Sequence, residues 1–101
     1  MENNLPVVCT LSSEEKAKRG EQIARDLLSG VVETKDLPDG TQLRFPGDEY
    51  WTMNLTQFVA FEQECCRFLT FELNFEPNLG SIWMCIRGSG EAVSFIKSSF
   101  R

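Results

Sequence analysis

The residues best suited to chemistry are one glutamate and two adjacent cysteines within a single stretch. Residues 55–69 have helical periodicity, and Glu62, Cys65 and Cys66 fall on the apolar face of the expected helix. A carboxylate on such a face is costly to bury without a proton, a hydrogen-bond donor or a cation. Cys65 and Cys66 follow Glu62 at the two spacings that meet on one side of a helix. The pattern therefore makes these three residues the candidates for a site.

A third sulfur would complete a three-sulfur binding site for a metal or metalloid ion. Cys9 is the candidate, because it lies on an apolar lead just before the first expected helix. Three thiolates select soft ions, and Glu62 could add a carboxylate ligand or accept a hydrogen bond beside the ion. Zinc accepts three sulfurs and one oxygen, whereas trigonal sulfur coordination suits Cu(I), Hg(II) or As(III). The predicted ligands are Cys9, Glu62, Cys65 and Cys66.

Two other interpretations remain open. Free cysteines are often buried as small hydrophobic residues, so Cys65 and Cys66 could simply fill core volume. The chain would then be an interaction module without a metal, either a homodimer or a binder of a small apolar ligand between helices and sheet. A thiol enzyme is the third choice, but an ionised Glu62 would raise the thiol pKa, and the sequence has no histidine to activate a nucleophile. The sequence thus favours binding over catalysis, and we assign no catalytic residue.

Seven elements must position these residues. We expect one α+β domain spanning residues 1–101, with residues 1–4 frayed and the order α-β-β-α-β-β-α. We expect Ser12 and Glu15 to form a capping box for the first helix. Asn54 could cap the central helix unless that helix starts earlier and includes Trp51. The expected elements are helix 13–28, strands 31–37 and 41–45, helix 55–69, strands 71–75 and 82–86, and a closing helix carrying Val93, Ile96 and Phe100.

The alternation of side chains predicts the two faces of a four-stranded, mainly antiparallel sheet with the helices on one face. Cys85 is expected on the outer face, beside Trp83 and Arg87. That face could also pair with another copy of the chain. The expected inward side chains are Leu43, Phe45, Phe71, Leu73, Phe75, Ile82, Met84 and Ile86.

Charge and composition limit the classes of binding partner and the cellular location that we expect. Ten Lys and Arg against fifteen Asp and Glu give a net charge of −5, and the basic residues are scattered, so we expect no nucleic-acid binding. The first residues show neither a basic leader nor a long apolar run, so we expect no membrane association and a cytoplasmic protein. In that reducing compartment the four cysteines are expected as free thiols or ligands rather than a disulfide framework.

Several motifs together resemble a small, functionally uncharacterised bacterial family over residues 9–96. They are Cys9-Thr10-Leu11, Leu37-Pro38-Asp39-Gly40, Leu43-Arg44-Phe45-Pro46, Phe61-Glu62 before Cys65-Cys66 and Phe68-Leu69, Phe71-Glu72-Leu73, Glu76-Pro77 and Ile82-Trp83-Met84.

The resemblance implies that Cys9, Glu62, Cys65 and Cys66 form one set that excludes Cys85. It also implies a link to metal or metalloid resistance, because members of the family sometimes accompany such genes. One position departs from the family, which usually has proline after the paired cysteines where this chain has Arg67. Because proline would end the helix early, Arg67 leaves the helix end and the direction of Cys66 open.

Overall fold

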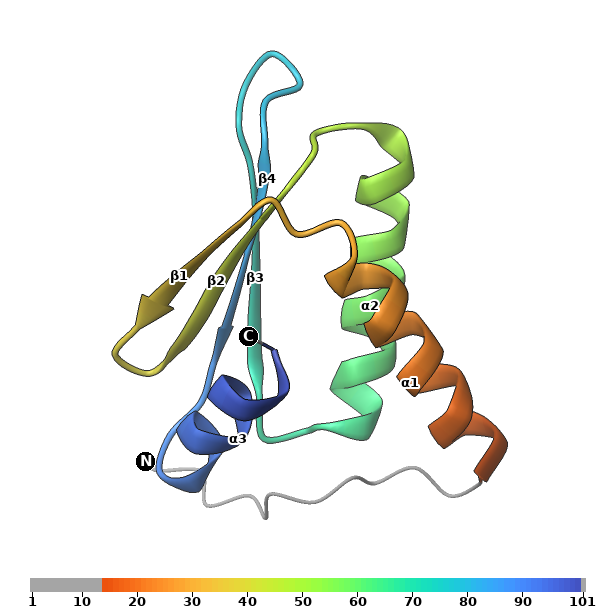
Figure 1. Ribbon diagram of the computed structural model, residues 1–101, viewed down its shortest axis with the longest axis vertical. Coiled ribbons are helices and arrows are strands. Elements are labelled where there is room, and N and C mark those ends of the chain that lie inside the picture. The colour runs from red at the N-terminus through yellow and green to blue at the C-terminus, as the bar shows by residue number, and fades with distance from the viewer. Residues whose placement is uncertain (1–13, 101) are drawn as a thin grey trace.

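The computed structural model describes residues 14–100, which form helices and one sheet in the predicted order (Figure 1). The predicted α+β class is therefore confirmed. Cys9, the Ser12 cap and the frayed residues 1–4 lie outside the described residues. The elements are α1 (Glu14–Leu28), β1 (Glu33–Leu37), β2 (Gly40–Phe45), α2 (Glu49–Cys65), β3 (Thr70–Phe75), β4 (Ile82–Arg87) and α3 (Glu91–Ser99).

The four strands form an antiparallel sheet in the order β1-β2-β4-β3, so β1 and β3 are its edges. The β1–β2 hairpin turns at Pro38 and Asp39, and the Asp39 carbonyl accepts a hydrogen bond from the Gly88 amide just beyond β4. A side chain at Gly40 would collide with the backbone of Ile86. Glycine at this position lets β2 and β4 approach closely.

The inner face of the sheet carries the core, as the alternation predicted. Leu43 and Phe45 of β2 are fully buried, whereas Gln42 and Arg44 lie on the outer face. Phe75 is the exception, because its side chain is 53% exposed rather than turned into the core. It pairs with Ile82 at the end of an edge strand, where no further strand covers its flank.

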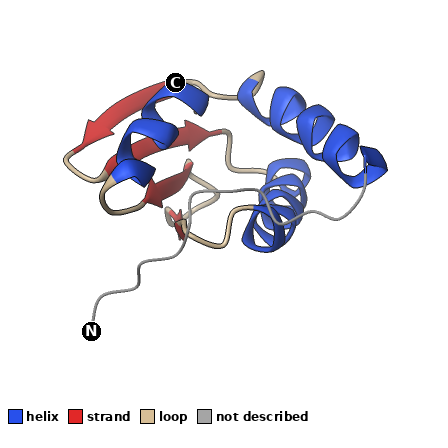
Figure 2. Ribbon diagram, turned by 90° about the horizontal axis from the view of Figure 1, so that it is seen from below, coloured by secondary structure: helices blue, strands red, loops and turns tan. Residues whose placement is uncertain are grey.

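The helices cover this inner face, and Figure 2 shows α1 and α2 on one side of the strands. Phe58 of α2 connects the layers, with its ring centroid 6.1 Å from that of Phe71 in β3 and 6.0 Å from that of Phe100 after α3. Leu27 of α1 and Ile96 of α3 are buried in the same core. Among the described residues, no helix is both long and apolar enough to span a membrane.

The bounds of α2 differ from those expected. The helix begins at Glu49 because the Asp48 carboxylate accepts a hydrogen bond from the Trp51 amide at 2.8 Å. Asn54 is therefore not a cap but an interior residue whose amide donates to the Tyr50 carbonyl. The alternative start that includes Trp51 is correct, and Trp51 is half-buried. At the other end, α2 stops at Cys65 rather than continuing to residue 69.

Candidate metal centre

One buried ridge of α2 supplies two of the candidate ligands. Leu55, Phe58, Glu62 and Cys65 are its buried residues, spaced so that they share one side of the helix. Leu55 and Phe58 bury the ridge in the core because both are apolar and face the sheet. Glu62 and Cys65 are buried because they lie on the same side of α2 as Phe58.

Cys66 joins them because the chain leaves the helix at this residue. Its backbone has φ −117° and ψ 73°, and its amide still donates to the Glu62 carbonyl at 2.6 Å. The Cys66 carbonyl accepts a hydrogen bond from the Leu69 amide at 3.1 Å, and β3 begins at Thr70. In Figure 1 this is the lower end of α2, where the chain turns into β3. The helix thus ends at the cysteine pair without a proline, while Arg67 is exposed.

The three side chains form a compact buried cluster. One ligand atom from each of Glu62, Cys65 and Cys66 lies within 4.8 Å of the others. The two sulfurs are 3.8 Å apart, well beyond a disulfide bond. The residues are only 7%, 9% and 6% exposed respectively, so bulk water hardly reaches the cluster.

Burial sets the protonation of the cluster. It raises the pKa of Glu62, an effect that a hydrogen bond with the Cys66 side chain partly offsets. Burial also raises the pKa of the Cys66 thiol, and the hydrogen bond and negative charge of Glu62 raise it further. Without a cation the cluster therefore favours protonated side chains. A bound cation would reverse this preference, because it stabilises the carboxylate and the thiolate together.

The donor set and spacing fit a soft ion. Two sulfurs bound to zinc at about 2.3 Å in tetrahedral geometry lie roughly 3.8 Å apart. The sulfurs of Cys65 and Cys66 have this separation already. A separation of this size is also an ordinary contact between thiols, so the spacing permits a metal without requiring one. The three residues leave at least one position of a tetrahedral ion for another ligand.

The structure thus brings three of the four predicted ligands together. Glu62, Cys65 and Cys66 converge, whereas Cys9 lies outside the described residues. Cys85 is separate, as expected, because it occupies the outer face of β4 between Gln42 and Glu72. It is nevertheless buried, and burial raises the pKa of its thiol.

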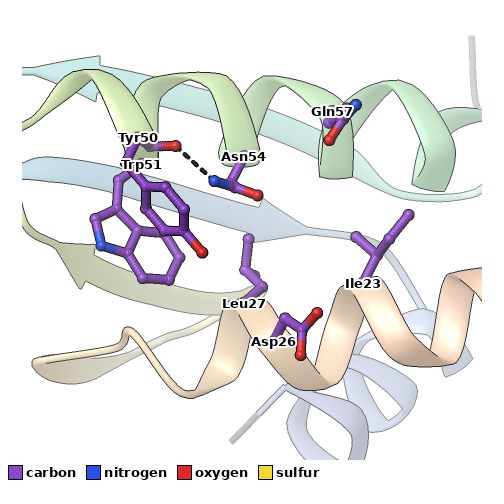
Figure 3. A pocket seen from close by; sticks show the side chains of 7 residues that line it. All are labelled: Ile23, Asp26, Leu27, Tyr50, Trp51, Asn54 and Gln57. Atoms are coloured by element: carbon purple, nitrogen blue, oxygen red, sulfur yellow. Dashed lines mark hydrogen bonds between the residues drawn. The ribbon is translucent and has the colours of Figure 1, made fainter.

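Two hollows beside the helices are lined by residues that the sequence did not single out as a site. One, of about 170 Å³, lies between α1 and α2, where Trp51 and Tyr50 face Asp26 and Leu27 across the helix pair (Figure 3). The adjacent aromatic residues Tyr50 and Trp51 are the sequence signal that could have located it. The other, of about 240 Å³, is lined by Leu28, Val31, Thr34, Leu43 and Phe100, between the helices and β1 and β2.

No protein-family model, curated protein or solved structure matches the chain. The resemblance inferred from the motifs therefore stays a prediction. What the fold and the cluster define is a small α+β protein with a buried Glu-Cys-Cys group able to hold a metal ion.

Proposed function

We propose that the chain is a small cytoplasmic binding protein that holds a soft metal or metalloid ion. Cys65, Cys66 and Glu62 bind the ion, and Cys9 supplies a third sulfur. The observation that supports this is the convergence of three ligand atoms within 4.8 Å in the protein interior. The link to metal or metalloid resistance that the resemblance implies agrees with such a role.

The donor atoms favour thiophilic ions over hard ones. Calcium and magnesium prefer sets of oxygen ligands, and this cluster offers two sulfurs for one carboxylate. With Glu62 and a third thiolate the set suits Zn(II), and with three thiolates alone it suits Cu(I), Hg(II) or As(III). Histidine ligands play no part, because the sequence contains none.

The pKa of Cys66 supports binding rather than thiol catalysis. A nucleophilic cysteine needs a lowered pKa, because the thiolate is the attacking species. Burial and Glu62 instead raise the pKa of the Cys66 thiol. A bound cation would reverse this shift, whereas the neighbouring groups of a substrate-binding cleft are normally arranged to lower it.

Titration of the anaerobically purified full chain with Zn(II), Hg(II), Cu(I) or As(III) tests the proposal. We expect one ion per chain, protection of thiols from alkylation, and thiolate charge-transfer absorption with Cu(I) or Hg(II). Cys65→Ser and Cys66→Ser should each weaken binding by more than about tenfold, and Glu62→Gln should weaken Zn(II) most. Cys9→Ser tests the third sulfur, since it should weaken the binding of As(III) and Hg(II) at least as strongly as Cys65→Ser or Cys66→Ser does.

Cys85→Ser is the matched control, because Cys85 is a buried cysteine outside the cluster. It should bind each ion as the wild type does. Equal binding by wild type and the Cys65→Ser, Cys66→Ser double variant would refute the proposal, as would the absence of thiol protection by every ion tested.

A second candidate function is an interaction module that binds a small apolar ligand. The hollow of about 240 Å³ supports it, since its lining is mainly apolar and it lies between helices and sheet. A fluorescent apolar dye should then bind the native chain, and Leu28→Ser should weaken it while the cysteine double variant should not. Dye binding that is unchanged by Leu28→Ser would count against this function.

A further inference from the structure

A groove far from the cysteine cluster gathers most of the exposed large apolar side chains. Met53, Phe75 and Leu79 are three of the five large apolar side chains that residues 14–100 leave exposed, at 65%, 53% and 87%. All three line one groove of about 380 Å³ between the start of α2 and the β3–β4 turn. Figure 1 shows these two segments at the upper end of the molecule. Apolar side chains gathered in this way are typical of an interaction site.

The β3–β4 turn holds Leu79 in an unfavourable backbone conformation. Asn78 and Leu79 have φ of 59° and 54°, in the left-handed region that asparagine tolerates and leucine does not. The turn is closed by the Glu76 carboxylate, which accepts from the Ser81 amide at 2.9 Å. The described residues gain little packing from the Leu79 side chain, since it is 87% exposed. A partner that covers this side chain would explain its presence.

Contacts within the chain hold both walls of the groove. A side chain at Gly47 would lie 1.5 Å from the Gly80 carbonyl oxygen, so the loop before α2 packs directly on the β3–β4 turn. Asp48 caps α2 and holds the other wall. Walls held in this way lower the entropy cost of docking.

The rim of the groove is acidic. Asp48, Glu49 and Glu76 line it, and no Lys or Arg does. Among the side chains that the structure describes, none of these three carboxylates forms an ion pair with Lys or Arg. A complementary partner must therefore combine bulky apolar side chains with positive charge.

Charge also distinguishes between the available occupants. A second copy of this chain has a net charge of −5 and would bring the same carboxylates to the groove. Residues 1–13 of the chain itself contain apolar side chains, but their only charged side chain is one glutamate, so they bring no Lys or Arg to the acidic rim. We propose that the groove docks a segment of a different protein that presents large apolar side chains flanked by lysine or arginine.

Fluorescence anisotropy with the full chain tests this inference. The probe is a short labelled peptide of Leu, Phe and Lys, compared with one in which Glu replaces Lys and one in which Ser replaces Leu and Phe. We expect the first peptide to bind at least about tenfold tighter than either other peptide, with an affinity that falls as salt increases. Leu79→Asn and Met53→Gln should each weaken it by about tenfold or more.

Val32→Thr is the matched control, because Val32 is 54% exposed but lies outside the groove. It should bind as the wild type does, and so should the Cys65→Ser, Cys66→Ser variant, which separates this inference from the proposed metal site. Equal binding of the basic and acidic peptides, no binding at about 1 mM, or no effect of Leu79→Asn would overturn it. So would a dimer, detected by light scattering, that Leu79→Asn dissociates.

Discussion

The sulfur atoms of Cys65 and Cys66 lie 3.8 Å apart although α2 ends between the two residues. Adjacent side chains on an unbroken helix point about 100° apart around its axis. At Cys66 the backbone departs from helical geometry, with φ −117° and ψ 73°. The end of the helix is thus part of the candidate site, since it sets the position of Cys66 beside Cys65 and Glu62.

Metal affinity should rise with pH. Burial raises the pKa of both Glu62 and Cys66, so the metal-free cluster holds protons that an ion must displace. Each displaced proton changes the apparent affinity by about tenfold per pH unit. Competition with a chelator between about pH 6 and pH 8, corrected for the chelator's own protonation, measures the slope. A slope of zero would contradict ligation by these residues.

Glu62→Gln should stabilise the metal-free protein at neutral pH. Because burial raises the pKa of Glu62, the folded state keeps a proton that the unfolded chain loses above a pKa of about 4.3. The wild type therefore loses stability as the pH rises from the pKa of Glu62 in the unfolded chain to its pKa in the folded protein. It does not regain this stability at higher pH. Glutamine carries no such penalty. Urea denaturation should give the variant the higher unfolding free energy at pH 7 and a similar one below about pH 4.

Glu21→Gln is the control for that experiment, because Glu21 is exposed on α1. It should change the unfolding free energy little at either pH. A Glu62→Gln variant that is less stable than wild type at pH 7 would mean that the ionised carboxylate stabilises the fold.

Leu79→Asn should stabilise the fold by about 1 kcal/mol, because asparagine tolerates the left-handed conformation that Leu79 adopts. Little packing is lost, since Leu79 is 87% exposed. Leu79→Ala is the control: it removes the apolar side chain but keeps a Cβ, so the unfolding free energy should hardly change. Equal stabilisation by both variants would show that the backbone strain is not the cause.

Gly47→Ala should destabilise the fold by about 2 kcal/mol or more, because its Cβ would lie 1.5 Å from the Gly80 carbonyl oxygen. The clash is with backbone, so the loop or the β3–β4 turn must move. Ser89→Ala is the control, since Ser89 is an exposed residue in the loop before α3. Its cost in thermal or urea denaturation should stay below about 0.5 kcal/mol. Comparable losses in both variants would argue against a fixed contact between Gly47 and Gly80.

Local patterns were enough to predict the order of elements. The alternation around Leu43 and Phe45 and the helical spacing of Phe58, Glu62 and Cys65 each identified the buried face correctly. Such patterns report burial because side chains repeat every 2 residues in a strand and every 3.6 in a helix. They located the start of α2 less well, because Asp48 and Asn54 are both good caps and the choice depends on the contacts of Trp51 and its neighbours.

The sequence by itself determined the α+β class, the inward side of α2 and the separation of Cys85 from the other two described cysteines. These follow from hydrophobic periodicity, which is local. Only the tertiary structure decided the strand order, the exposure of Phe75 at an edge and the end of α2 at Cys65. Those features depend on which segments pack together across long stretches of chain, and no local repeat encodes that pairing. The sulfur spacing at the candidate metal centre belongs to this second group, because the turn from α2 into β3 sets it.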